Sequence, residues 1–325
     1  MPVDLNTIWM VLAVLLASYS IVGNDSIQTL GTFLSSNSHR PWWVLWIFAG
    51  LIMTGVLFYG YFALGDVSYE RLARFPWPEG GITWIYVLPP LVLLILTRLS
   101  IPVSTTFLVL TIFTLTLGDM GSMLTKSLLG YAVAAVTGFL VFRFVVKRAT
   151  EYFARTRNDP IPRYWVVLQW CSTGFLWSQW IIQDIANIFV FFPRDLSVPT
   201  FLFGVFALLA LQGWLFRQKG GPIQRIVRSK TGVTDVRSAT IIDFIYGVIL
   251  FIFKEMSNIP MSTTWVFLGL LAGREVGLAL YLSGTDMKTT LRTVVMDAGK
   301  ATFGLFMSVA LALGLPWLAM KFAGA

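Results

Sequence analysis

A short polar motif rich in hydroxyl side chains occurs twice in this otherwise apolar chain. Residues 101–106 read Ile-Pro-Val-Ser-Thr-Thr, and residues 259–264, 158 positions later, read Ile-Pro-Met-Ser-Thr-Thr. Proline suits the first turn of a helix, where its missing N–H is not needed. The hydroxyls and the free backbone N–H groups of that turn would then donate hydrogen bonds at the positive end of the helix dipole. Each motif therefore predicts an anion-binding helix terminus.

These hydroxyls also have a simpler use, because serine and threonine in membrane helices often bond to their own helix or to a neighbouring one. A single copy of the motif would favour that interpretation. Two copies in register favour a shared site, in which the two termini face each other and surround a tetrahedral oxyanion without an arginine. The six side chains predicted to line this site are Ser104, Thr105, Thr106, Ser262, Thr263 and Thr264.

A second pair of motifs contains carboxylates and amides. Asp25 lies within residues 24–28 (Asn-Asp-Ser-Ile-Gln), and Asp184, 159 positions later, lies within residues 183–187 (Gln-Asp-Ile-Ala-Asn). An ionised carboxylate at membrane depth is costly and usually functional. The neighbouring amides supply carbonyl oxygens, and oxygen-rich sites suit a hard cation, although a proton-bearing acid in a structural network is the alternative. We assign Asn24, Asp25, Gln183 and Asp184 to two symmetry-related sodium sites, with Asp25 and Asp184 as the principal ligands, and Gln28 and Asn187 to the substrate site beside them.

The composition places these motifs in a membrane. The 325 residues are 56% hydrophobic and only 12% charged, with a mean hydropathy of +0.74, whereas a soluble domain has about 25% charged residues. The net charge of +8 comes from basic residues clustered in loops beside apolar segments, which is the positive-inside pattern and requires no nucleic-acid partner. The single Cys171 and the single His39 exclude an intrachain disulfide, a multi-cysteine metal site and a histidine-rich metal site.

Two different motifs recurring in the same order indicate an internal duplication. We divide the chain into a first membrane repeat (1–146), a basic cytoplasmic linker (147–163) and a second membrane repeat (164–325), which contains a basic cytoplasmic loop at 217–238. If each hydroxyl motif crosses the membrane once, each half has five spans, and an odd number inverts the second half. The prediction is an all-α integral membrane protein with two inverted-topology repeats and about ten spans, including broken helices or re-entrant hairpins. Such repeats place substrate and ion sites at their interface, near the midplane.

Local sequence adds detail to this prediction. Glycine followed by two polar residues at 23–25 indicates a helix broken at membrane depth, and a second break is expected at Gln183 and Asp184. With both basic loops inside, both termini lie outside the plasma (inner) membrane. Several other charged residues fall near predicted span ends, and the adjacent pairs among them are interpreted as snorkelling or paired structural charges. These residues include Asp243, Lys254, Glu255, Arg274 and Glu275.

The order of the motifs resembles that of the inorganic phosphate transporter (PiT) family, which also includes a sulfate permease. That family has a motif similar to Gly-Ala-Asn-Asp-Val-Ala-Asn-Ala-x-Gly-Thr, and a motif Pro-x-Ser-Thr-Thr-His, in each half. The family histidine is Phe107 in one half here and Trp265 in the other, and glutamine replaces asparagine at Gln28 and Gln183. The matching positions are Asn24, Asp25, Gln28, Gly31, Thr32, Pro102, Ser104, Thr105 and Thr106 in the first half, and Asp184, Ala186, Asn187, Pro260, Ser262, Thr263 and Thr264 in the second.

The resemblance implies secondary transport of phosphate or a similar oxyanion by alternating access, driven by sodium or protons. A dianion between Asp25 and Asp184 would face two like charges, and helix dipoles of about half a charge each do not offset them. The amide oxygens favour sodium as the offsetting charge, because a protonated acid needs no ring of carbonyl oxygens. The alternative is a proton-coupled transporter of sulfate or a small organic anion. We expect no enzymatic activity and no cofactor, and leave a homo-oligomer open.

Overall fold

The computed structural model describes residues 4–99, 101, 103–113, 117–156, 159–220, 235–256, 260–280 and 287–323, and all regular elements in these ranges are helical. The helices of the first half are α1 (Leu5–Ile21), α2 (Ile27–Ser36), α3 (Trp42–Phe58), α4 (Leu88–Arg98), α5 (Thr105–Leu110) and α6 (Leu117–Leu140), followed by α7 (Lys147–Arg155). The helices of the second half are α8 (Arg163–Asp184), α9 (Ala186–Phe189), α10 (Val198–Arg217), α12 (Val236–Met256), α13 (Thr263–Ala279) and α14 (Met287–Ala323).

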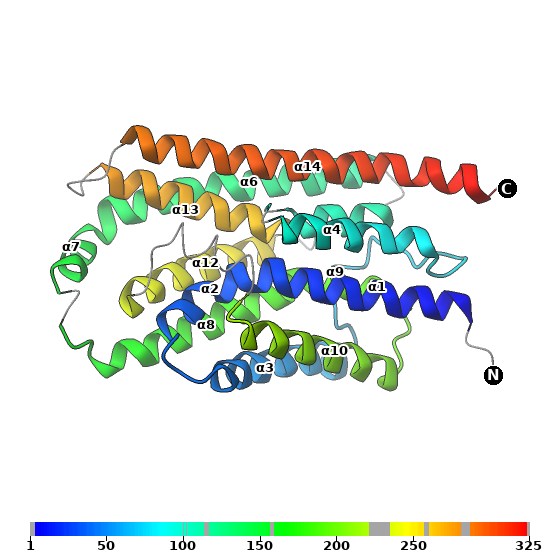
Figure 1. Cartoon of the computed structure of the whole chain (residues 1–325), viewed down its shortest axis with the longest axis horizontal. Helices are drawn as coiled ribbons and strands as arrows, with labels where there is room; N and C mark the ends of the chain where they lie inside the picture. Colours follow the sequence, from blue (N-terminus) through cyan, green and yellow to red (C-terminus); the bar gives the residue numbers. More distant parts are fainter. Residues whose placement is uncertain are drawn as a thin grey trace.

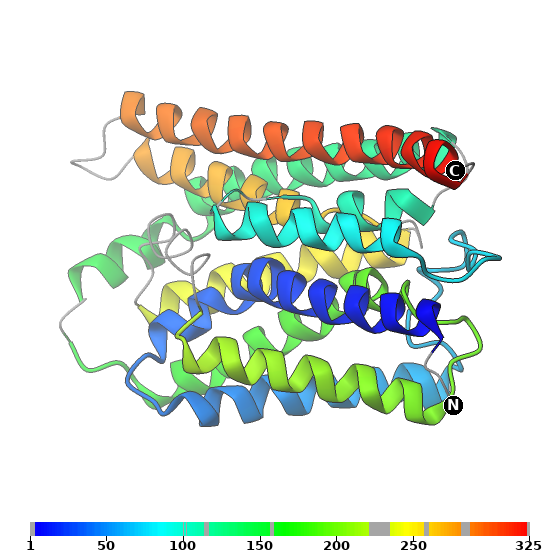
Figure 2. The same ribbon diagram turned by 45° about the vertical axis from the view of Figure 1, so that its right-hand side comes forward.

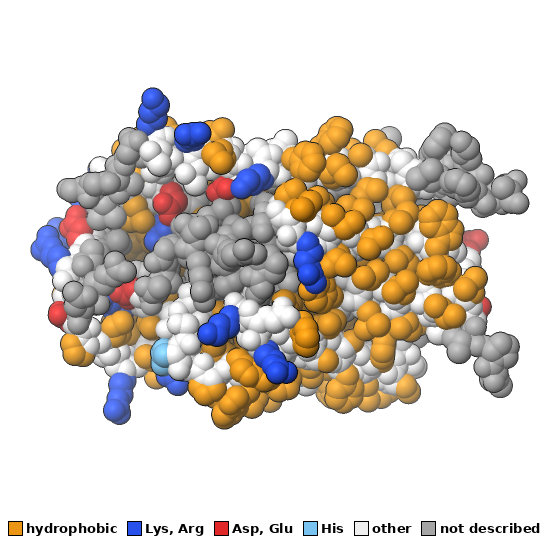
Figure 3. Space-filling model, in the orientation of Figure 1, with side chains coloured by type: hydrophobic (Ala, Val, Ile, Leu, Met, Phe, Trp, Pro, Cys, Tyr) orange, Lys and Arg blue, Asp and Glu red, His pale blue; other side chains and the backbone are white. Residues whose placement is uncertain are grey.

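The composition of the helices confirms a multi-pass membrane protein. Within the described ranges, six helical stretches are long and apolar enough to cross a bilayer. Large apolar side chains such as Leu51, Phe206 and Phe306 are exposed on their outer faces, as expected for surfaces that contact lipid. Basic side chains gather towards the left end of the face drawn in Figure 3, whereas apolar side chains cover most of the right part.

Corresponding helices of the two halves run in opposite directions. In Figures 1 and 2, α1 and α6 run from right to left, whereas α8 and α14 run from left to right. The helices α3 and α10 also run antiparallel to each other (Figure 1). As a result, α1 begins and α14 ends at the same end of the molecule.

The hydroxyl motifs lie where the chain turns back inside the bundle. The helix α4 enters from the right and α5 leads back towards the right, whereas α12 enters from the left and α13 leads back towards the left (Figures 1 and 2). Each segment therefore turns back at its motif, and α12 (Val236–Met256) is also long and apolar enough to cross a bilayer.

The helices α6 and α13 approach each other unusually closely, and small residues make this contact possible. Gly269 and Gly273 lie four residues apart on α13. A Cβ atom on Gly269 would lie 2.3 Å from the carbonyl oxygen of Tyr131, and one on Gly273 would lie 1.9 Å from that of Ala135. Both distances are far below van der Waals contact, so only glycine permits this packing between the two backbones.

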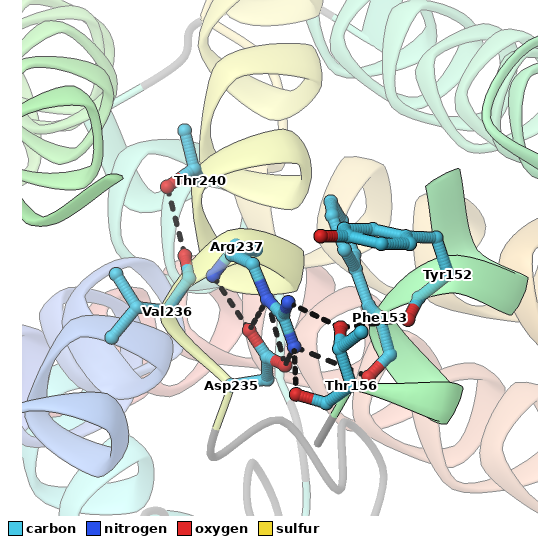
Figure 4. A network of polar contacts seen from close by, with 7 residues as sticks. All are labelled: Tyr152, Phe153, Thr156, Asp235, Val236, Arg237 and Thr240. Carbon is cyan, nitrogen blue, oxygen red and sulfur yellow. Dashed lines mark hydrogen bonds and ion pairs between the residues drawn. The ribbon is translucent and has the colours of Figure 1, made fainter. Parts of the chain in front are cut away.

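An arginine at the start of α12 connects this helix to the linker helix α7 (Figure 4). Arg237 is 3% exposed. Its guanidinium pairs with Asp235 at 2.6 Å and donates hydrogen bonds to the hydroxyl of Thr156 at 2.8 Å and to the carbonyl oxygen of Phe153 at 3.1 Å. It also lies over the ring of Phe153, 4.6 Å from the centroid. Figure 4 shows the hydrogen bonds and the ion pair converging on one side chain, which ties the linker helix α7 to the second half.

Arg237→Lys is expected to lower the melting temperature of the protein. Lysine keeps the positive charge, but it lacks the planar fork that reaches three acceptors at once. Each lost hydrogen bond to a charged group costs about 1.5–3 kcal/mol of unfolding free energy. Thermal unfolding in detergent would measure the change, with Arg217→Lys, at an exposed position at the end of α10, as the control. Equal melting temperatures for the two variants would contradict a stabilising role for the network.

Candidate functional site

The two aspartates singled out from the sequence lie at interruptions of long helices. Asp25 belongs to a π-helical segment, Val22–Ser26, that joins α1 to α2. Asp184 is the last residue of α8 and precedes the interruption at Ile185. Their side chains are buried, with 2% and 0% exposure. Interruptions therefore occur at both predicted positions, but the first is a local widening of the helix and not an unwound break. Such π-helical turns are frequent at functional sites.

The hydroxyl motif of each half contacts the aspartate of the other half. Thr106, on α5, donates a hydrogen bond to Oδ1 of Asp184 at 2.9 Å. Thr264, on α13, donates one to Oδ1 of Asp25 at 3.0 Å. Thr106 and Thr264 occupy the same position in the two copies of the motif. The predicted anion and cation motifs thus form a single buried cluster, in which equivalent bonds cross between the halves.

Amide side chains complete the surroundings of the two carboxylates. The side-chain nitrogen of Asn24 donates to Asp25 at 2.7 Å, and that of Asn187 donates to Asp184 at 3.0 Å. The side-chain nitrogen of Gln28 donates to Oδ1 of Asn24 at 3.2 Å. Hydrogen-bond donors therefore reach Oδ1 of Asp25 and both oxygens of Asp184. Several other acceptor oxygens of the cluster remain available.

Four buried side-chain oxygens in this cluster have no hydrogen-bond donor among the described residues. The amide nitrogen of Gln183 donates to the carbonyl oxygen of Leu250 at 3.0 Å. The Oε1 atom of the same amide therefore points away from that carbonyl oxygen. The four oxygens are Oδ2 of Asp25, Oε1 of Gln28, Oε1 of Gln183 and Oδ1 of Asn187. Buried acceptors without donors are rare in folded proteins and require an explanation. A set made only of oxygens is the chemistry that hard cations prefer.

The serines of the two motifs have a different role from the threonines. Ser104 accepts a hydrogen bond from the backbone N–H of Phe107 at 3.2 Å, and Ser262 accepts one from that of Trp265 at 3.3 Å. Each serine is therefore the N-cap of its helix. Pro260 precedes the N-cap by two residues, so the prediction that it occupies the first helical turn is wrong. The other proline of the repeated motif, at position 102, lies outside the described residues.

Two buried basic residues near the cluster were not found by the sequence analysis. Arg71, in the loop between α3 and α4, is 1% exposed. Burial lowers its pKa to about 10, whereas the negative charges of Asp184 and Glu255 act in the opposite direction. Lys126 on α6 is 9% exposed. Neither basic residue has a counterpart at the equivalent position of the other half. The internal duplication, which was the strongest signal in the sequence, therefore did not identify them.

Asp243 is a third buried carboxylate, in the interior and not at a membrane surface. It is 1% exposed, and its two oxygens accept hydrogen bonds from Thr32 and Thr173, each at 2.6 Å. Its position near a predicted span end gave no indication of this burial. The adjacent pairs behave as interpreted from the sequence, because Lys254 pairs with Glu255 at 2.8 Å and Arg274 pairs with Glu275 at 2.6 Å.

The described residues form a bundle of membrane helices that encloses a buried cluster of carboxylates, amides and hydroxyls. A solved structure titled "The sodium-dependent phosphate transporter" has the same fold, with a TM-score of 0.63 and 14% sequence identity over 98% of this chain and 99% of that chain. No protein family and no curated protein matches the sequence. The predicted all-helical membrane fold is confirmed, and the neighbour shares it over nearly the whole of both chains.

Proposed function

We propose that this protein is a symporter that moves inorganic phosphate, or a similar oxyanion, together with sodium by alternating access. The observation that carries the proposal is the central cluster, in which Asp25 and Asp184 each accept a hydrogen bond from the threonine of the opposite half. The structural neighbour, by its title a sodium-dependent phosphate transporter, supports the same class of substrate. The opposed directions of the two halves support inverted-topology repeats, with both termini outside the membrane.

The proposed sodium ligands are the acceptor oxygens around the two aspartates. Asp25 would bind sodium together with Gln28, and Asp184 together with Gln183 and Asn187. Among the described residues, Oδ2 of Asp25 and one side-chain oxygen of each of the three amides have no donor. This extends the sodium sites to Gln28 and Asn187, which the sequence analysis assigned to the substrate. A carbonyl oxygen repels an oxyanion but binds a cation, so the cation explains these oxygens better. No cofactor is needed for this role.

The threonine hydroxyls link the cation to the anion. In the described arrangement, Thr106, Thr263 and Thr264 donate their protons to carboxylate oxygens. A hydroxyl has one proton, so it cannot donate to a carboxylate and to an oxyanion at the same time. Sodium bound to the carboxylates would replace these protons as the positive partner. The hydroxyls and the free N–H groups of the first turn of α13 would then be available to the oxyanion.

Removing one of these hydroxyls is expected to weaken substrate binding. In Thr106→Val and in Thr264→Val, a buried donor to a charged acceptor is lost, which costs about 1.5–3 kcal/mol, or roughly a tenfold to hundredfold loss of affinity. Phosphate affinity in the presence of sodium would be measured for both variants. Thr240→Val is the matched control, because Thr240 is buried and donates only to its own helix, at the carbonyl oxygen of Val236. Unchanged affinity in both motif variants would reject the shared site.

Uptake of labelled phosphate and sulfate into proteoliposomes tests the proposed function. We expect uptake of one of these oxyanions to require an inward sodium gradient. Uptake that ignores sodium but follows an imposed pH gradient would support the proton-coupled alternative. If the protein took up a small organic anion but neither phosphate nor sulfate, the substrate class would be wrong. The fold assignment would not change.

A further inference from the structure

The contact between α5 and α9 changes from polar to aromatic as the two segments leave the central cluster. At the cluster, the side-chain nitrogen of Asn187 donates a hydrogen bond to the hydroxyl of Thr106 at 3.1 Å. Phe191 follows Asn187 by four residues, and Phe113 follows Thr106 by seven, so helical spacing places the rings on the same faces as the polar pair. The ring centroids of Phe113 and Phe191 are 5.5 Å apart, edge to face, and the two side chains are 4% and 0% exposed.

The two rings lie on the side of the cluster that faces the N-terminal end of the molecule. Both α5 and α9 lead from the cluster towards the right in Figures 1 and 2, where α1 begins. At that end, Phe189 and Phe192 line a cavity of about 960 Å3, whose other walls come from residues within 61–76 and 193–198. Residues 189–192 therefore separate this cavity from the part of the chain that reaches the cluster, at Asn187.

Arg194 holds residues 189–192 against a loop of the first half. Its guanidinium donates hydrogen bonds to the carbonyl oxygens of Val190 and Phe192 at 3.2 and 2.9 Å. It donates two more, at 2.7 and 3.0 Å, to the carbonyl oxygen of Phe75, in the loop between α3 and α4. The same group lies over the ring of Trp77, 5.8 Å from the centroid. One side chain therefore joins the aromatic segment of the second half to the first half.

The chemistry of this contact allows it to open. Basic side chains often bond the last carbonyl oxygens of a helix, and here they fix the direction in which the chain leaves α9. All four hydrogen bonds of Arg194 end on neutral carbonyl oxygens. Opening them leaves no unpaired carboxylate behind, in contrast to the breaking of a buried ion pair.

We propose that the rings of Phe113 and Phe191 are the gate of the transport path on the side of the N-terminus, and that Arg194 is the positioning residue that holds this gate shut. The inference rests on the proposed function, because alternating access requires a path that is closed on one side at a time. Packed apolar rings exclude water and ions, as hydrophobic constrictions do in channels. Release of Arg194 would let residues 189–192 move away from Phe113 and connect the cavity with the cluster.

A thiol placed in the cluster reports whether the gate is open. The single Cys171 is changed to serine, and Thr106→Cys introduces a thiol beneath the rings with little change in size. A charged, membrane-impermeant methanethiosulfonate reagent is added outside sealed proteoliposomes, and a tag on the N-terminus shows which side of each molecule faces the reagent. The rate of thiol labelling is measured, with the denatured protein as the reference for complete reaction.

We expect slow labelling from the side of the N-terminus while Arg194 is present. Arg194→Gln should raise this rate about tenfold or more, because the loss of one charged hydrogen bond already shifts an opening equilibrium by about that factor. Phe191→Ala should raise it too, since one of the two rings is removed. Labelling from the opposite side should stay within about twofold, because the gate closes one side only.

Arg74→Gln is the matched control. Arg74 belongs to the same loop as Phe75, but its side chain is 62% exposed and it pairs with Asp119 at 3.7 Å. An exposed ion pair of this kind contributes little to stability. This variant should therefore label at the same rate as the protein that retains both arginines.

Two outcomes would overturn the inference. If Arg194→Gln lowered the melting temperature but left the labelling rate unchanged, Arg194 would only stabilise the fold. If labelling rose equally from both sides, the variant would have loosened the whole bundle and not one gate. The assay needs no substrate, so one-sided labelling that depends on Arg194, in a protein that takes up neither phosphate nor sulfate, would support the gate and reject the proposed function.

Discussion

Asp25→Asn and Asp184→Asn are each expected to abolish the sodium dependence of uptake while the protein remains folded. Asparagine has nearly the same shape as aspartate and can still accept the hydrogen bonds from Thr264 and Thr106. It lacks the negative charge that offsets the dehydration of a bound cation. Uptake at several sodium concentrations would be measured for both variants, with Asp159→Asn, at an exposed position in the linker, as the control.

The two results that contradict this prediction have different meanings. Sodium-dependent uptake that persists in both asparagine variants would show that the ion binds elsewhere in the protein. Loss of sodium dependence in only one variant would show that the two carboxylates are not equivalent. The second result would fit their different surroundings, since Asp184 accepts hydrogen bonds on both oxygens, whereas Oδ2 of Asp25 has no donor among the described residues.

Gly273→Leu is expected to cause the largest loss of stability among the variants considered. Even the first carbon of the new side chain would lie 1.9 Å from the carbonyl oxygen of Ala135. That oxygen belongs to the backbone of α6 and cannot move aside as a side chain does. Overpacking in cores costs typically about 1–3 kcal/mol, and occasionally more. We expect low yield and a strongly reduced melting temperature.

Gly55→Ala is the matched control for the helix contact. Gly55 lies in α3, and a Cβ atom there would meet nothing within 4 Å. Alanine in a helix is more favourable than glycine by roughly 0.5–1 kcal/mol, so this variant should be as stable as wild type or slightly more stable. A wild-type melting temperature for Gly273→Leu would show that α6 and α13 do not pack this closely.

The sequence identified the central site because its signals are strong in a membrane protein. Carboxylates and amides are rare inside apolar helices, and the duplication selected Asp25 and Asp184 from the other acidic residues. The same reasoning found the interruptions at these residues, because glycine and polar side chains disfavour an uninterrupted membrane helix. Types and order of residues were therefore sufficient to find the side chains that the fold brings into one buried cluster.

Other features of the site depend on tertiary contacts that spacing does not specify. Thr106 is equally able to bond the aspartate of its own half or that of the other half, and only the packing of α5 against the second half selects Asp184. Whether a hydroxyl motif spans the membrane or turns back depends on what surrounds its extended segment. Arg71 lies in a loop of mixed charge, where an arginine is ordinarily exposed. The sequence pattern therefore could not predict that it is buried.

The glycine contact between α6 and α13 has a consequence for how the molecule changes shape. Each glycine faces one particular backbone carbonyl of α6, so the two helices cannot slide past each other by a fraction of a turn without a steric clash. They form a single rigid body, although α6 belongs to the first half and α13 to the second. In the alternating access that we propose, the parts that rock would therefore not be the two sequence halves. In that proposed cycle, Thr264 would move with α6. Its bond to Asp25 would then cross the boundary between the moving parts, at the place where we propose that sodium binds.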